Sequence, residues 1–215
     1  MQAEEWKNYF ESAHIVLEEN KTYLCELDRA LGDGDHGITM SIGWKAVQEA
    51  LHSKLADETD CGKIAMTAGR SFLSAVGSSV GPLYASGFMA GAKAVKNKTE
   101  LSMEDMRQFW IEFTNGVQER SQAEPGDKTM VDVLYPVQEA LQSEDGTVEK
   151  KFEQASQAAK DGMEATREMS SQKGRSSRLG ERSIGHQDPG ATSMQLLFST
   201  FVTEALNLKT VKEEY

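Results

Sequence analysis

Apolar residues in this chain recur every three or four positions, which is the spacing of one face of an α-helix. The pattern is clear from Met103 through Met106, Trp110 and Phe113 to Val117. Further series with the same step begin at Trp6, Ile64, Val148 and Met194. Segments in which apolar and polar residues alternate, as they do in a half-buried strand, are essentially absent. The sequence therefore predicts an all-α fold.

Seven breaks separate the helical stretches, so we expect eight helices. The breaks fall at 32–37, 54–60, 77–81, 97–102, 121–127, 143–147 and 170–189. Most are short, and short connections favour antiparallel neighbours in an up-and-down bundle or a closed helical ring. Pro136 falls inside the sixth helix and is expected to kink it. Since no linker-like stretch or repeat divides the chain, we expect a single domain over residues 1–215.

Charge and composition narrow the classes of partner. The 34 acidic residues outnumber the 23 basic ones, giving a net charge of −11 that repels nucleic-acid backbones. No apolar run approaches the ~18 residues of a membrane span, and the acidic N-terminus does not resemble a signal peptide. Cys25 and Cys61 are far apart, which favours free thiols in a reducing cytoplasm. We expect a cytoplasmic protein without nucleic-acid or membrane partners.

The stretch LGDGDHG, residues 31–37, spells the G-x-G-x-x-G pattern of a dinucleotide-binding turn. That turn needs a strand before its glycines, whereas a helical stretch precedes Gly32 here. A calcium-binding loop starting at Asp33 would need Glu at its twelfth position, where Trp44 stands. A P-loop motif does not occur. The stretch therefore fits none of these three standard loops.

Three carboxylates remain in and beside this loop: Asp28, Asp33 and Asp35. The glycines let the chain fold back over Asp28, so the three groups can converge. At ~5 Å and an effective dielectric constant near 20, each like-charged pair costs ~3 kcal/mol, so the cluster needs a cation. Oxygen ligands favour Mg²⁺ or Ca²⁺ over zinc, and Mg²⁺ commonly completes its shell with phosphate oxygens. The alternative is an acidic helix end followed by an Asx-type turn.

Residues 170–190 form an unusually long connection with four glycines and no apolar series. It carries four cations within ten residues, namely Lys173, Arg175, Arg178 and Arg182. One interpretation is a solvated, mobile loop. The other is an anion-binding lid, because guanidinium groups match phosphate oxygens and glycines allow closure.

Four ordered motifs resemble those of the DhaL family, the nucleotide-binding subunits of dihydroxyacetone kinases. They are LDRALGDGDHG (27–37), GSSVGPLY (77–84), EPGDKTMVDVL (124–134) and GRSSRLGERSIGHQDPGATS (174–193). The resemblance extends from about Trp6 to Leu208. It implies an eight-helix antiparallel up-and-down barrel, with a nucleotide diphosphate and two Mg²⁺ ions at one end.

The resemblance also implies roles for particular residues. Asp28, Asp33 and Asp35 would hold the metal ions. Nucleotide contacts would come from His36, Gly37, Ile38, Thr39, Ser78, Ser79, Gly126, Met130, Arg175, Asp188, Pro189 and Gly190. His36 and Thr39 would meet the phosphates at a helix N-terminus, which favours anions. Arg175 would stabilise developing charge, and no residue would act as a nucleophile.

Several of these residues also have a purely structural interpretation. Asp188 followed by Pro189 is a good helix N-cap, and Met130 alone is more often core than ligand contact. Because His36 lies beside three carboxylates, we expect its charged form to be favoured. The sequence departs from the family pattern at Thr39, Val80, Ser121 and Arg178, which leaves details of base recognition open.

As for function, the resemblance implies a subunit that carries ADP as a coenzyme. A phosphohistidine protein (DhaM) would phosphorylate the bound ADP, and the phosphoryl group would pass to dihydroxyacetone held by a DhaK subunit. One alternative is a kinase subunit that uses ATP, for dihydroxyacetone or another short ketose. A second is a non-catalytic regulator of the same fold that binds Mg²⁺ and nucleotide. The sequence does not determine the ketose, the phosphoryl donor or the oligomeric state.

Overall fold

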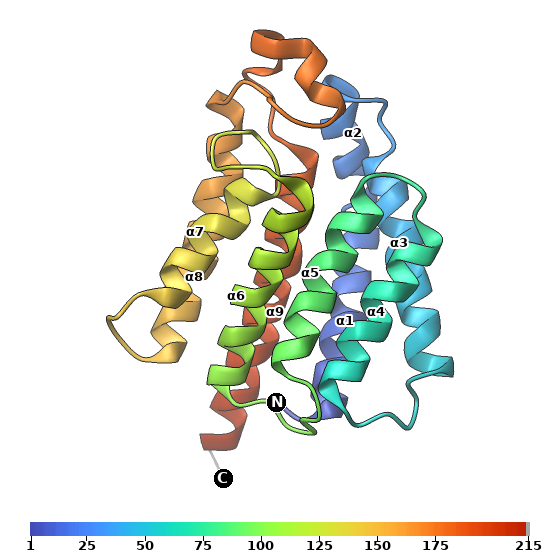
Figure 1. Cartoon of the computed structure of the whole chain (residues 1–215), viewed down its shortest axis with the longest axis vertical. Coiled ribbons are helices and arrows are strands. Elements are labelled where there is room, and N and C mark those ends of the chain that lie inside the picture. The colour runs from blue at the N-terminus through green and yellow to red at the C-terminus, as the bar shows by residue number, and fades with distance from the viewer. Residues whose placement is uncertain (214–215) are drawn as a thin grey trace.

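The long helices run side by side (Figure 1), and their contacts close them into a ring around a shared core. The structure is a computed structural model that describes residues 1–213, with the side chains of residues 1–207. Around the ring, α1 (Ala3–Glu19) packs against α3 (His36–Ser53), and each later helix packs against the next until α9 (Pro189–Glu213) meets α1 again. The members between α3 and α9 are α4 (Cys61–Ala75), α5 (Val80–Ala94), α6 (Met103–Ser121), α7 (Val131–Gln142) and α8 (Val148–Ala165). The all-α barrel is therefore confirmed.

The helix count differs from the expected eight, because residues 1–213 contain nine α-helices and two 3-10 helices. The first expected helix divides at Asn20, and α2 (Lys21–Leu31) begins there and lies across one end of the ring against α3 and α9. Asn20 leaves the helical conformation at φ −92° and ψ 4°. Its side-chain amide and its backbone N–H both donate to the carbonyl of Val16, at 2.8 and 3.1 Å. The backbone bond is the usual i→i−4 bond of a helix, whereas the side-chain bond competes with helix propagation.

Aromatic side chains fill the centre of the ring. Trp6, Phe109 and Trp110 have no exposed surface. Trp6 meets Phe109 edge-on with ring centroids 5.1 Å apart, and Trp110 meets Phe198 edge-on at 4.9 Å. Such pairs add ~1 kcal/mol each beyond the burial of their area. The apolar series found in the sequence are thus the inner faces of the helices.

Side-chain caps start some of the helices in the barrel. Ser102 accepts a hydrogen bond from the backbone N–H of Asp105, whose carboxylate accepts from the N–H of Ser102, and this pair starts α6. Asp60 accepts from the N–H groups of Gly62 and Lys63 at the start of α4. A cap of this kind contributes ~1 kcal/mol. The caps place the connecting loops at defined positions.

The loops at one end of the barrel come together in space, at the upper end in Figure 1. They are residues 32–35, 76–79, 122–130 and the long segment 166–186, which contains η1 (Thr166–Glu168) and η2 (Arg175–Ser183). η2 packs against α2. Pro136 lies inside α7, as expected. No helix within the described residues is long and apolar enough to cross a membrane, and Cys25 and Cys61 are free and buried.

Candidate functional site

A cavity of about 460 Å³ opens at this end of the barrel. All four loops line it. Its walls include Asp28, Asp33, Asp35, His36, Ser78, Ser79, Leu83, Arg120, Ser121, Lys128, Met130, Lys173, Arg175, Asp188, Pro189 and Gly190. The lining combines apolar side chains, among them Leu83 and Met130, with carboxylates and guanidinium groups. A site of this size and mixed polarity can hold a small charged ligand.

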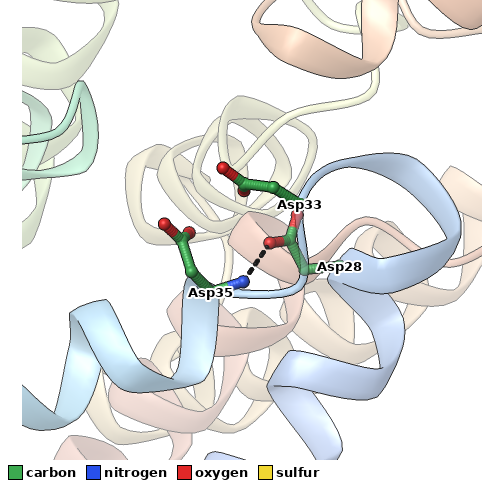
Figure 2. Close-up of side chains that lie close together, drawn as sticks. All are labelled: Asp28, Asp33 and Asp35. Carbon is green, nitrogen blue, oxygen red and sulfur yellow. Dashed lines mark hydrogen bonds between the residues drawn. The ribbon is translucent and has the colours of Figure 1, made fainter.

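The side chains of Asp28, Asp33 and Asp35 lie close together (Figure 2), and all three residues line the cavity. One oxygen from each lies within 4.8 Å of the others. The side chains of Asp33 and Asp35 are about half exposed, so solvent and ligands can reach them. The predicted convergence therefore occurs, and the cluster can accept a divalent cation through oxygen atoms alone.

The backbone of residues 32–35 brings the carboxylates together. Asp28 lies in the last turn of α2, and one of its oxygens accepts from the N–H groups of Asp35 and His36 at 2.8 and 3.2 Å. This carboxylate therefore caps the start of α3. Gly34 has φ +80°, which favours glycine, and a Cβ on Gly32 would collide with Asp28 Oδ1. Residues 32–35, the carboxylate loop, therefore need glycine at positions 32 and 34 to adopt this backbone.

Segment 166–186 reaches this cluster from above. Arg175 at the start of η2 donates to Asp33 through Nη1, which also lies 4.0 Å from Asp35 Oδ2. Lys173 lies 3.9 Å from Asp127. The other two predicted lid cations, Arg178 and Arg182, are exposed and do not line the cavity. Two of the four cations thus belong to the site.

His36 differs from the expectation that its charged form is favoured. The ring is buried, and its Nε2 lies 2.9 Å from Ser193 Oγ. Burial lowers the pKa of His36 to about 4, although the charge of Asp28 acts in the opposite direction. Desolvation exceeds the attraction of the carboxylate, so the expectation is wrong and the imidazole is neutral at pH 7.

Asp188 lines the cavity and is the residue just before α9. Its Oδ2 accepts from the N–H of Ala191 at 2.7 Å, and Pro189 occupies the first helical position. The structural interpretation of Asp188 and Pro189 as a cap is confirmed, and both also line the cavity. Burial raises the pKa of Asp188 to about 7, and the nearby charge of Asp132 adds to this.

Lys128 is only 1% exposed, and it was not among the residues predicted from the sequence. Its ammonium group lies within hydrogen-bond distance of four backbone carbonyl oxygens, those of Thr166, Met169, Ser183 and His186, which share its three N–H donors. Burial lowers the pKa of Lys128, opposed by the charges of Asp188 and Asp132. The only signal in the sequence was a lysine inside the motif EPGDKTM, with nothing to indicate that its partners were main-chain atoms.

The remaining predicted contacts divide into two groups. Ser78, Ser79 and Met130 line the cavity, and Ser78 Oγ is buried with no hydrogen-bond partner in the described part of the chain. A buried hydroxyl without a partner is costly, and this one is available to a ligand. Gly37, Ile38, Thr39 and Gly126 do not line the cavity. Arg120 and Ser121 at the end of α6 do line it. The sequence indicated a departure from the family pattern at Ser121 but gave no sign of Arg120.

A family model supplies the decisive comparison, since the DAK2 domain matches residues 30–203. The chain belongs to the DAK2 domain family. The matched range includes Asp33, Lys128, Arg175 and Asp188, although Asp28 lies just before it. The cavity is therefore built almost entirely from the family's domain.

Named relatives of this DAK2 domain chain are similar over nearly their whole length. It is 39% identical over 201 residues to the "PEP-dependent dihydroxyacetone kinase, ADP-binding subunit DhaL" of Escherichia coli, covering 92% of this chain and 95% of that protein. It is 42% identical over 183 residues to the "PEP-dependent dihydroxyacetone kinase 1, ADP-binding subunit DhaL" of Listeria innocua, covering 85% of this chain and 86% of that protein.

A solved structure shares the fold. The dihydroxyacetone kinase from C. freundii, solved in complex with AMP-PNP and Mg²⁺, superimposes with a TM-score of 0.68 at 23% identity. The match covers 91% of this chain and 33% of that one. The barrel thus corresponds to about a third of a longer kinase chain.

Proposed function

We propose that this chain is the nucleotide-binding subunit of a dihydroxyacetone kinase and carries Mg²⁺–ADP as a coenzyme. A phosphohistidine protein of the DhaM type phosphorylates the bound ADP, and the phosphoryl group then passes to dihydroxyacetone held by a DhaK-type subunit. The observation that carries this proposal is the convergence of Asp28, Asp33 and Asp35 at the mouth of a cavity that Arg175 also lines. The names of the relatives support it.

The residues present suit a magnesium nucleotide. Carboxylate oxygens are the ligands that Mg²⁺ prefers, and one oxygen from each of the three aspartates lies within 4.8 Å of the others. We propose that two ions bind here, with phosphate oxygens supplying further ligands and charge. The unpartnered hydroxyl of Ser78 and the guanidinium of Arg175 suit phosphate oxygens. The apolar side chains of Leu83 and Met130 in the cavity lining suit a nucleotide base. Bound Mg²⁺ neutralises phosphate charge and polarises the phosphoryl group for transfer.

The chain's own contribution is positioning and charge stabilisation. Asp28, Asp33 and Asp35 hold the cations at the mouth, and Arg175 steadies the charge that develops on the phosphoryl oxygens. The proposed transfer needs no nucleophile from this chain. Donor and acceptor proteins must both reach the same mouth, and their surfaces must complement a chain of net charge −11. The free thiols of Cys25 and Cys61 are compatible with the cytoplasm, where we propose that the subunit acts.

A second candidate is a kinase subunit that uses ATP or phosphorylates another short ketose. It is favoured by the similarity to "L-erythrulose 1-kinase" of Mycolicibacterium smegmatis, which is 30% identical over 189 residues. The match covers 87% of this chain but only 33% of that protein. A subunit with a similar barrel could thus serve a different sugar or donor.

Reconstitution tests the proposal. The protein is combined with a DhaK-type subunit, dihydroxyacetone, Mg²⁺ and ADP, and either a phosphorylated DhaM-type protein or ATP is added. We expect dihydroxyacetone phosphate only with the phosphorylated protein as donor. Product formed from ATP alone, or from erythrulose in preference to dihydroxyacetone, would favour the second candidate. A protein that purifies without nucleotide and whose melting temperature is unchanged by added Mg²⁺–ADP would contradict both.

A further inference from the structure

Lys128 connects two stretches of the long segment above the cavity. Its Nζ lies 2.7 and 3.1 Å from the carbonyl oxygens of Thr166 and Met169, where the segment begins. It lies 2.8 and 2.5 Å from those of Ser183 and His186, where the segment ends. One buried cation therefore holds both stems of a loop that spans residues 170–182.

The loop that presents Lys128 is itself ordered by a buried carboxylate. Asp132 accepts from the backbone N–H of Gly126 and of Thr129, both at 2.6 Å. Lys128 lies between these two residues with φ +62°, a conformation that side-chain-bearing residues rarely adopt. The backbone of Lys128 is thus held in an uncommon conformation, from which its side chain reaches the stems.

The stems connect to the site through a short run of further bonds. Ser183 Oγ accepts from the N–H of Ser171 at 2.8 Å, and Ser171 Oγ lies 2.6 Å from Ser176 Oγ. Arg175 is the residue before Ser176, and it donates to Asp33 across the mouth of the cavity. The position of Arg175 therefore depends on stems that the Lys128 ammonium group holds together.

We propose that Lys128 is a positioning residue, whose ammonium group fixes the stems of segment 166–186 and thereby sets the place of Arg175 over the aspartates. Lys128 acts on the ligand through Arg175. The part of this inference that concerns nucleotide affinity rests on the proposed function, whereas the part that concerns the stems does not.

Hydrogen exchange of the full-length protein without nucleotide tests the stems. Lys128→Met keeps the length of the side chain and removes its donors, leaving the carbonyls without their partner. We expect amides in residues 170–186 to exchange roughly ten- to a hundredfold faster, in line with the loss of bonds to a charged group. Lys128→Arg keeps a cation with several donors and should restore part of the protection. Exchange at the wild-type rate in Lys128→Met would overturn the proposal.

A matched control separates this effect from a change in net charge. Lys150 is exposed in the first turn of α8, a helix of 18 residues, so it lies roughly 25 Å from the stem at the far end. Lys150→Met should exchange in residues 170–186 at the wild-type rate. Equal acceleration in both variants would contradict a role specific to Lys128.

A double-mutant cycle on the affinity for Mg²⁺–ADP tests the route through Arg175. We expect Lys128→Met and Arg175→Ala each to weaken binding roughly tenfold, and the double variant to match Arg175→Ala within about twofold. The route through Arg175 would be overturned if the loss of affinity in the double variant equalled the product of the two single losses. It would also be overturned if Lys128→Met weakened binding while Arg175→Ala left it unchanged. If wild-type protein does not bind Mg²⁺–ADP, the proposed function fails, and the exchange experiment alone decides the role of Lys128.

Lys128→Met could prevent folding, and a milder variant covers that case. Ser183→Ala removes the hydroxyl that accepts from the N–H of Ser171 and donates to the carbonyl of Gly180, so it loosens the same stems. We expect faster exchange in residues 170–186 and a weakening of Mg²⁺–ADP binding that disappears in the Arg175→Ala background. Unchanged exchange in Ser183→Ala would contradict the dependence of Arg175 on the stems.

Discussion

Arg175 donates a hydrogen bond to Asp33, although 142 positions separate the two residues in the chain. The contact joins the segment above the cavity to the carboxylate loop below it. Arg175 also lies near Asp35, at 4.0 Å. A guanidinium and a pair of carboxylates therefore share the mouth of the cavity, where a cation bound by the aspartates and an anion bound by Arg175 would meet.

Asp33→Asn should weaken Mg²⁺–ADP binding by at least about tenfold, because mutation of a group that only orients a metal ligand already lowers metal affinity by about that factor. The same change removes a like-charged neighbour of Asp28 and Asp35, so the protein without metal should not lose stability. Isothermal titration calorimetry measures the affinity, and thermal unfolding measures the stability.

Asp57→Asn is the matched control for Asp33→Asn, since Asp57 is exposed in the loop before α4. It changes the net charge equally and should bind Mg²⁺–ADP as the wild type does. Unchanged affinity in Asp33→Asn would rule out Asp33 as a metal ligand.

The sequence indicated those parts of the molecule that depend on local periodicity. The apolar series predicted the helices and their inner faces, and the aspartates beside glycines predicted the convergence at the cavity. The break at Asn20 was missed because a single polar side chain bonding its own helix leaves the apolar spacing almost unchanged.

Other parts of the site depend on contacts that residue identity does not encode. The partners of Lys128 are main-chain carbonyls, which every residue possesses. The neutral state of His36 follows from its burial beside Ser193, 157 positions away. Arg178 and Arg182 turn outward because η2 presents only one side to the cavity, and the sequence of an irregular segment does not fix that side.

Ser78→Ala should weaken Mg²⁺–ADP binding about fivefold without lowering the melting temperature. The hydroxyl is buried without a partner, so its removal relieves a desolvated polar atom in the protein alone and removes a donor from the ligand. Ser74→Ala, an exposed serine on α4, is the control and should change neither quantity. A fall in melting temperature with full affinity would show that Ser78 is structural.

The stability of the protein should depend on pH through Asp188. Its carboxyl has a pKa raised by burial from 3.8 to about 7, so between these values the folded protein keeps a proton that the unfolded chain has lost. The contribution of this group to the free energy of unfolding falls as pH rises through that window, by at most about 1.4 kcal/mol per pH unit, and is constant above it.

Chemical denaturation at pH 5 and pH 7.5 measures this dependence. The wild type should lose roughly 2 kcal/mol more stability over that interval than Asp188→Asn, which cannot titrate but can still accept the N–H of Ala191. Asp161→Asn, an exposed residue of α8, controls for net charge. An equal loss in wild type and Asp188→Asn would show that Asp188 does not hold the proton.

Gly32→Ala tests whether the carboxylate loop requires its glycine for metal binding. A Cβ at this position collides with Asp28 Oδ1, so the carboxylate must move away from Asp35 and from the start of α3. We expect Mg²⁺–ADP affinity to fall by about tenfold. Displacing a metal ligand should lower affinity at least as much as mutating a residue that only orients such a ligand. The lost cap should also destabilise the protein by ~1 kcal/mol. Gly77→Ala is the matched control, because a Cβ there meets nothing within 4 Å. Wild-type affinity in Gly32→Ala would mean that Asp28 can bind metal without capping α3.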